Sequence, residues 1–118
     1  MHIQHVGIAV RDAEAARRFY TEAFDLVELP RPDFGIPGHW LADPRGAQIH
    51  ILQLDDATPF PAGVHVAFEV DDIDAARARL AELGVASSEP RAFQAGAARQ
   101  SVLHDPDGNM IELNQPPR

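Results

Sequence analysis

Four side chains of this sequence could together bind a metal ion. They are three histidines and one glutamate: His5, His50, His65 and Glu112. Imidazole and carboxylate groups are ligands of borderline divalent ions, so this set suits Zn, Fe(II), Mn, Ni or Co. A single histidine on a strand is more often a core or surface residue than a ligand. The prediction of a metal site therefore depends on how the four residues are spaced.

The four candidates occupy matched positions of an internal repeat. The segment HVGIAVRDAEAAR at 5–17 matches HVAFEVDDIDAAR at 65–77, which pairs His5 with His65. The segment DPRGAQIHI at 43–51 matches DPDGNMIEL at 105–113, which pairs His50 with Glu112. Because the two segments come in the same order in each half, we expect two similar modules within a single domain over 1–118. The modules span about 1–54 and about 64–115, and the Pro- and Gly-containing stretch 55–63 links them.

Each module is predicted to fold as one strand, one helix and three further strands. In the opening strand of the first module, apolar Val6, Ile8 and Val10 alternate with His5, Gly7 and Ala9. Asp12 and either Asp71 or Asp72 are candidate N-caps of the two helices. The later strands are expected at 26–29, 39–42 and 47–54 in the first module, and near 86–88, 98–104 and 109–114 in the second. This order predicts an α+β fold of two tandem βαβββ modules, with curved mixed sheets and a helix on the convex side of each.

The predicted strands bring the four ligand candidates to one face. If the Val and Ile side chains of each sheet pack against its helix, the histidines and Glu112 point to the concave side. A pseudo-twofold arrangement of the two modules would bring all four together around one ion. The other histidines have no partner in the repeat and are predicted to be surface residues: His2, His39 and His104. Glu69 shares the inward side but ends its strand, which favours a solvated carboxylate.

The composition excludes several classes of function. The formal net charge is −8 and all ten basic residues are arginines, so binding to nucleic acid is not expected. Without lysine, neither Schiff-base chemistry nor a P-loop is available. Without cysteine, there is no disulfide or thiol nucleophile. No apolar run approaches the roughly 20 residues of a membrane span, and no signal sequence is visible, so a cytoplasmic protein is expected.

At this point the sequence resembles the glyoxalase / bleomycin-resistance / extradiol-dioxygenase superfamily, the vicinal oxygen chelate fold. The motifs that carry the resemblance are HVGIAV, FYTEAFDL, GAQIHILQL, GVHVAFEVDDIDAARARL and DPDGNMIEL, and it covers essentially the whole chain. In that family the ligands come from the first and last strands of each module, which here are His5, His50, His65 and Glu112. The resemblance implies chelation of a small-molecule substrate through two adjacent oxygens. It also implies a homodimer, in which each site could combine residues of two subunits.

The resemblance leaves the reaction open. Glyoxalase I enzymes usually carry a glutamate at the position of His50 and an arginine at that of Ala9, and methylmalonyl-CoA epimerases a glutamine at the former. Lyase, isomerase or dioxygenase chemistry is therefore expected, with Glu112 as ligand or catalytic base. Five further residues are candidates for substrate contacts: Trp40, Gln53, Arg91, Gln100 and Asn114. Two alternatives stay open: a metal-independent drug-binding dimer of the bleomycin-resistance type, and a remnant that only dimerises.

Overall fold

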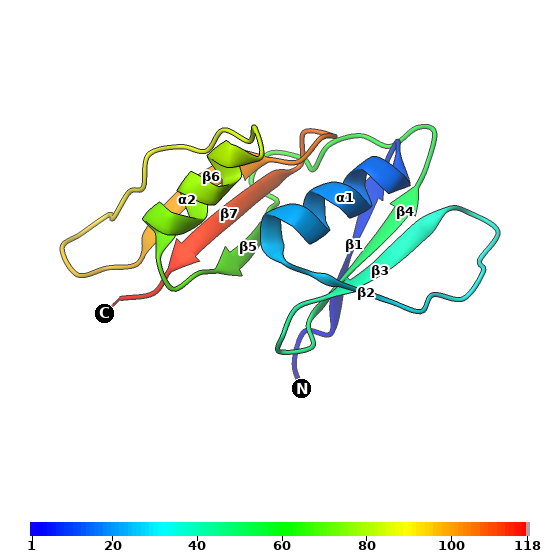
Figure 1. Cartoon of the computed structure of the whole chain (residues 1–118), viewed down its shortest axis with the longest axis horizontal. Coiled ribbons are helices and arrows are strands. Elements are labelled where there is room, and N and C mark those ends of the chain that lie inside the picture. The colour runs from blue at the N-terminus through cyan, green and yellow to red at the C-terminus, as the bar shows by residue number, and fades with distance from the viewer. Residues whose placement is uncertain (118) are drawn as a thin grey trace. The chain divides into compact units, whose positions relative to one another are not determined.

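A computed structural model describes residues 1–117 of the chain, which divides into two compact units. The first unit is Met1–Thr58 and the second begins at Pro59. The division falls inside the stretch 55–63, where the sequence predicts the linker between the repeats. Each unit contains one helix and one mixed sheet, as the α+β prediction requires (Figure 1). None of the helices within residues 1–117 is long and apolar enough to cross a membrane.

The first unit has a four-stranded sheet with α1 against one face (Figure 1). Its elements are β1 (His5–Val10), α1 (Ala13–Phe24), β2 (Val27–Leu29), β3 (Gly38–Ala42) and β4 (Gln48–Gln53). The strand order is β1-β4-β3-β2. β1 and β4 are parallel because α1, β2 and β3 intervene between them, whereas the short connections produce antiparallel β2–β3 and β3–β4 pairs.

The second unit repeats this arrangement with one strand fewer. Its elements are β5 (Val66–Glu69), α2 (Ile73–Glu82), β6 (Arg99–His104) and β7 (Met110–Gln115), in the order β5-β7-β6. Again the first and last strands are parallel and the last two antiparallel. The prediction of Asp12 as N-cap of α1 is confirmed, and of the two candidates for α2 the N-cap is Asp72. Each side chain accepts a backbone N–H from the first turn of its helix.

The prediction of a strand near 86–88 is wrong. Ser88 is bonded to β6 without forming a ladder: its N–H donates to the Val102 carbonyl, its carbonyl accepts from the Ser101 hydroxyl, and its hydroxyl oxygen accepts the Val102 N–H. Beyond this segment, Arg91 forms an isolated bridge with Gln100. The segment has no alternating apolar face, and Pro90 has no N–H to donate to a ladder. Leu83 is the C-cap of α2 and is 44% exposed.

Strand alternation separates two faces of each sheet. In the first unit the core lies against α1 and consists of the apolar alternates of the strands: Ile8, Val10, Leu41, Ile49 and Ile51. On the other face, His50 lies between Gly7 of β1 and Trp40 of β3. In the second unit Ile111 and Leu113 are buried against the α2 side, and Glu112 between them points to the other face. The sheets thus place the ligand candidates opposite the helices within each unit.

Equivalent glutamines at the ends of β4 and β7 fix the start of each helix. The Gln53 side-chain oxygen accepts the Ala13 N–H at 3.0 Å, and that of Gln115 accepts the Ile73 N–H at 2.9 Å. Gln115 and Ile73 are both buried, whereas Gln53 is only half-buried. Each bond satisfies an N–H that the first turn of a helix cannot pair internally.

We expect Gln115→Ala to destabilise the protein more than its counterpart Gln53→Ala. The first leaves the Ile73 N–H buried without a partner, which costs about 1–3 kcal/mol. Ala13 is buried too, but Gln53 is only half-buried, so we expect water to replace its side-chain oxygen beside the Ala13 N–H at a cost of about 0.5–1.5 kcal/mol. Urea unfolding of both variants measures the difference, and equal costs would contradict this account of the two glutamines.

Candidate metal site

The first pair of candidate ligands is His5 on β1 and His50 on β4. Their imidazole rings are stacked, with centroids 3.9 Å apart and planes at 10°. Trp40 on β3 stacks on the other face of His50, at 4.4 Å and 11°. The three rings therefore form a continuous stack across three neighbouring strands. Because His50 is stacked on both faces, the plane of its ring is fixed before any ligand binds.

The second pair is His65 and Glu112 on β7. His65 Nε2 lies 3.0 Å from Glu112 Oε2. The other carboxylate oxygen, Oε1, accepts a hydrogen bond of 3.2 Å from the Asn114 amide. The Glu112 side chain is 11% exposed and that of His65 is 40% exposed. A largely buried carboxylate is therefore held against an accessible imidazole, and these residues are the repeat counterparts of His50 and His5.

Each of the three imidazoles has at least one ring nitrogen next to an oxygen acceptor from a nearby residue. His5 Nδ1 contacts the Gln4 side-chain oxygen, and His50 Nε2 lies 2.8 Å from that of Gln48. His65 Nδ1 lies 3.0 Å from the Gly63 carbonyl oxygen. For His5 and His50, an acceptor of this kind favours the tautomer in which the opposite nitrogen is a lone-pair donor, whereas the opposite nitrogen of His65 faces Glu112 Oε2 at 3.0 Å. The pattern is that of metal-binding histidines, so the donor set and its supporting bonds fit a divalent ion.

The pKa of His50 is lowered, chiefly because burial disfavours its charged form and further because His5 and Arg31 repel a positive charge there. The direction keeps the imidazole neutral at neutral pH. A neutral imidazole is the form that binds a metal.

The structure brings His5 next to His50 in the first unit and His65 next to Glu112 in the second. Among residues 1–117, no group of three or more His, Asp or Glu side chains forms a metal cluster. The four-residue ligand set therefore stays a prediction, which rests on two adjacent pairs and on the chemistry of their donors.

Four of the five predicted substrate contacts lie on the strand face of the ligand candidates. Trp40 stacks on His50, and Asn114 is bonded to Glu112. Gln100 lies opposite Asn114 in the sheet and Arg91 opposite Gln100. Gln53 lies on the helix face, where its side chain is bonded to α1, so we omit it from the substrate contacts proposed below.

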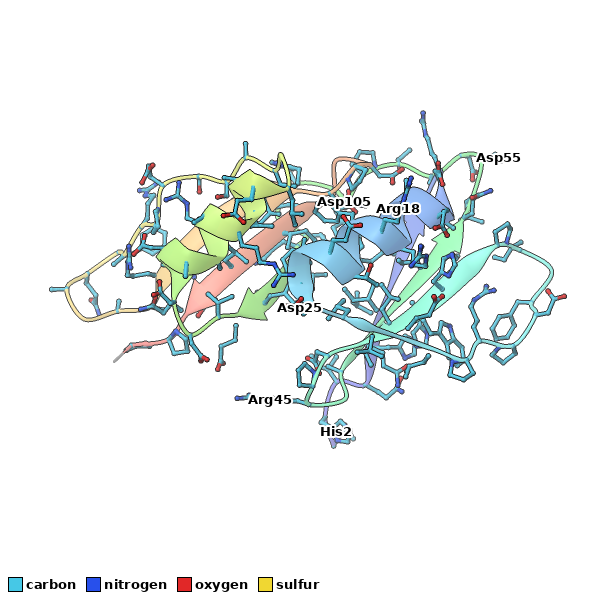
Figure 2. All side chains as sticks on the ribbon, in the orientation of Figure 1. His2, Arg18, Asp25, Arg45, Asp55 and Asp105 are labelled. Carbon is cyan, nitrogen blue, oxygen red and sulfur yellow. The ribbon has the colours of Figure 1, made fainter. Side chains whose placement is uncertain are left out.

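The other polar candidates lie mostly at the surface. His2, His104 and Glu69 are exposed, and Figure 2 shows His2 extending from the chain near the N-terminus. His39 differs from expectation because it lies within β3 on the helix face, half-buried. Its Nδ1 is 2.5 Å from Glu28 Oε2, and its Nε2 is 3.7 Å from Glu14 Oε2. These contacts make His39 a link between β2, β3 and α1.

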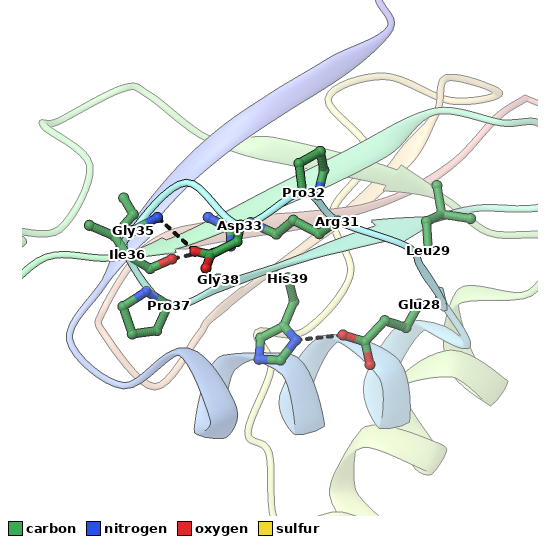
Figure 3. A pocket seen from close by; sticks show the side chains of 10 residues that line it. All are labelled: Glu28, Leu29, Arg31, Pro32, Asp33, Gly35, Ile36, Pro37, Gly38 and His39. Carbon is green, nitrogen blue, oxygen red and sulfur yellow. Dashed lines mark hydrogen bonds and ion pairs between the residues drawn. The ribbon is translucent and has the colours of Figure 1, made fainter.

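Sequence reasoning missed Arg31, in the loop between β2 and β3. This loop encloses an open hollow of about 690 Å³ lined by Glu28–Leu29, Arg31–Asp33 and Gly35–His39 (Figure 3). His5 and His50 do not line the hollow. The guanidinium of Arg31 nevertheless is one of the charges that lower the pKa of His50. No local periodicity marks a loop arginine, although Arg31 and Arg91 have the same spacing in the sequence as His5 and His65.

A family profile that spans both modules identifies the family of this chain. The profile of the Glyoxalase/Bleomycin resistance protein/Dioxygenase superfamily matches residues 2–113. The chain belongs to this superfamily. The resemblance noted in the sequence is thus confirmed, and the fold agrees with that of solved glyoxalase-fold proteins.

The proteins to which this chain is similar are named for different activities. An ethylmalonyl-CoA/methylmalonyl-CoA epimerase of Cereibacter sphaeroides is 35% identical, with 96% of each chain covered. TnmS3, an antibiotic binding protein from Streptomyces sp. CB03234, is 36% identical with a TM-score of 0.73, covering 98% of this chain and 96% of that one. The fold also matches a FosX variant from Listeria monocytogenes in complex with Mn(II), at 21% identity and a TM-score of 0.85, covering 98% and 92%. The similar proteins thus include an epimerase and an antibiotic-binding protein, and the fold is shared with a protein solved in complex with Mn(II).

Proposed function

We propose that this chain is an enzyme that uses a divalent metal ion to chelate and activate a small oxygenated metabolite. The proposed ligands are His5, His50, His65 and Glu112. Two observations together carry the proposal. His5 stacks on His50 and His65 contacts Glu112, and each of these three histidines has an oxygen acceptor next to at least one ring nitrogen. A histidine that is only a surface residue does not need its tautomer fixed, whereas a ligand does.

When bound, the ion would supply Lewis acidity to two adjacent substrate oxygens. The protein supplies orientation and exclusion of water. Trp40 offers a flat aromatic wall beside His50, and Gln100 and Arg91 offer hydrogen-bond donors on the face that carries Glu112. Asn114 holds Glu112 Oε1, which leaves Oε2 to receive a proton or to remain a ligand.

Among lyase, isomerase and dioxygenase reactions, we favour an isomerisation by proton transfer, with Glu112 as the base. The support is the 35% identical relative named as an epimerase, which aligns over almost the full length of both chains. A carboxylate with one oxygen fixed and the other next to an imidazole suits the removal and return of one proton. We also propose a homodimer whose sites each combine His5 and His50 of one subunit with His65 and Glu112 of the other.

Metal analysis of the purified wild-type protein beside His5→Ala tests the proposal. We expect near-stoichiometric metal in the wild type and its loss in the variant, measured by mass spectrometry of the protein after gel filtration. His104→Ala is the matched control, because it removes an exposed imidazole that has no place in the proposed site. Wild-type protein that binds no divalent ion would contradict the proposal.

A second candidate function is metal-independent binding of a planar antibiotic. It is favoured by the stack of Trp40, His50 and His5, and by the 36% identity with an antibiotic binding protein. Tight binding of an aromatic drug by protein stripped of metal would support this candidate over the enzyme.

A further inference from the structure

Within the part of the chain that the structure describes, Arg31 is a preorganised cation without an acidic partner. Its Nη1 donates to the Ile36 carbonyl oxygen at 3.1 Å, and its Cζ lies 5.0 Å from the centre of the Phe34 ring. The residue is half-buried. The ion pairs found within residues 1–117 do not include Arg31. These two contacts with uncharged groups hold the guanidinium in place. Because a guanidinium has five N–H donors, several of them stay available to a ligand.

The position of Arg31 connects it to the histidine pair. The Phe34 ring over which it lies is 6.1 Å from Trp40, and Trp40 stacks on His50. A Cβ added at Gly38 would lie 2.8 Å from the Arg31 Cζ. The missing side chain at Gly38 therefore allows the guanidinium to lie against the edge of β3, on the strand that carries Trp40.

The second unit contains a similar arrangement. Arg91 follows Arg31 at the same spacing in the sequence as His65 follows His5. Its guanidinium lies 5.5 Å from the centre of the Phe93 ring, as that of Arg31 lies over Phe34. Each module thus holds one arginine over one phenylalanine in the segment before its next strand. The two arginines occupy equivalent positions of the repeat, whereas the phenylalanines do not, since Phe34 follows Arg31 by three residues and Phe93 follows Arg91 by two.

We propose that Arg31 recognises an anionic group of the substrate, a carboxylate or a phosphoryl group, beside the oxygens that the metal binds. This inference rests on the proposed function, which supplies the neighbouring site. A guanidinium binds such groups through two parallel N–H bonds, and partial burial strengthens them. The substrate class is then a small oxygenated acid or phosphorylated metabolite.

Anion binding by metal-free protein tests the proposal. Trp40 is the only tryptophan, so its fluorescence reports on the face that Arg31 adjoins. Protein stripped with a chelating resin is titrated separately with malonate and with inorganic phosphate at low ionic strength. We expect saturable binding that Arg31→Gln weakens by about 10- to 100-fold, the effect of losing a charged hydrogen-bonding partner. The stronger-bound probe distinguishes a carboxylate from a phosphoryl group.

Two control variants separate recognition from simple charge or folding effects. Arg31→Lys keeps the charge without the planar fork and should bind with intermediate affinity. Arg18→Gln removes the same charge from the exposed surface of α1 (Figure 2) and should bind like wild type. Thermal unfolding of each variant confirms that it is folded.

Metal binding is measured on the same proteins. Above neutral pH, where the His50 imidazole is neutral with or without the Arg31 charge, Arg31→Gln should bind the divalent ion like wild type, because Arg31 is not a proposed ligand. Anion binding that is absent from wild type, or equal in wild type and Arg31→Gln, would overturn the inference and leave the metal site intact. If the wild-type protein binds no divalent ion, the proposed function is overturned instead.

Discussion

Replacement of Glu112 by alanine should weaken divalent metal binding by about 100-fold or more. Loss of a second-sphere partner alone typically costs about 10- to 100-fold, and Glu112 is the only carboxylate in the proposed ligand set. Its side chain is largely buried and lies 3.0 Å from His65, so we expect no other carboxylate to replace it as a ligand. Isothermal titration of metal into stripped protein measures the effect.

Glu69→Ala is the matched control. Glu69 is an exposed carboxylate on β5, opposite Asn114 in the same sheet, and its loss should leave metal affinity unchanged. Glu112→Gln adds a test of folding, because a neutral amide removes the cost of a buried charge. Metal-free Glu112→Gln should therefore unfold at the same urea concentration as wild type or a higher one. Stoichiometric metal in Glu112→Ala would disprove the assignment of this ligand.

Co-expression of His5→Ala with Glu112→Ala distinguishes sites within a chain from sites across a dimer. If each site combines both subunits, the mixed dimer contains one site with all four ligands intact and one site that lacks two of them. One metal ion per mixed dimer is then expected. If each site lies within one chain, the mixed dimer should bind no metal.

The second large effect is expected at Asp105, in the turn before β7. Its Oδ1 accepts the N–H groups of Asp107 and Asn109 at 2.9 and 2.8 Å, and its Oδ2 accepts the Asn109 amide at 2.9 Å. Asn109 is fully buried, and its side-chain oxygen in turn accepts the Phe60 N–H. Asp105→Ala leaves several buried donors without acceptors, so we expect a loss of about 3–4 kcal/mol in unfolding free energy.

Asp43 provides the comparison, because it occupies the equivalent turn of the first unit. It accepts the backbone N–H groups of Arg45 and Ala47 at 2.9 and 3.0 Å, in a more exposed turn. Asp43→Ala should therefore cost only about 1 kcal/mol. Urea unfolding of the pair checks the difference. Similar losses in both would mean that burial of the second turn contributes little.

The sequence predicted those features whose causes are local. The N-caps Asp12 and Asp72 were predictable because capping depends on residues within one turn. The face of His50 followed from strand alternation, and its equivalence with Glu112 followed from the repeat. Gln53 was predicted as a substrate contact although it follows His50 by an odd number of positions on one strand, and this spacing already favours the helix face on which it lies.

Other features depend on contacts between distant residues. Whether 86–88 forms a strand depends on pairing with β6 across a long loop, and a few apolar or small residues do not specify that pairing. The position of Arg31 depends on a loop conformation and on the space left at Gly38. Neither follows from periodicity, so only coordinates could reveal them.

The central claim is that matched strand positions of the two modules bind one metal ion. Diffraction data collected at the absorption edge of Co(II), from crystals grown with that ion and without chelator, test it most directly. We predict one anomalous peak within about 2.0–2.3 Å of ligand atoms from His5, His50, His65 and Glu112. A peak bound by other residues, or four side chains that share no ion, would contradict the claim.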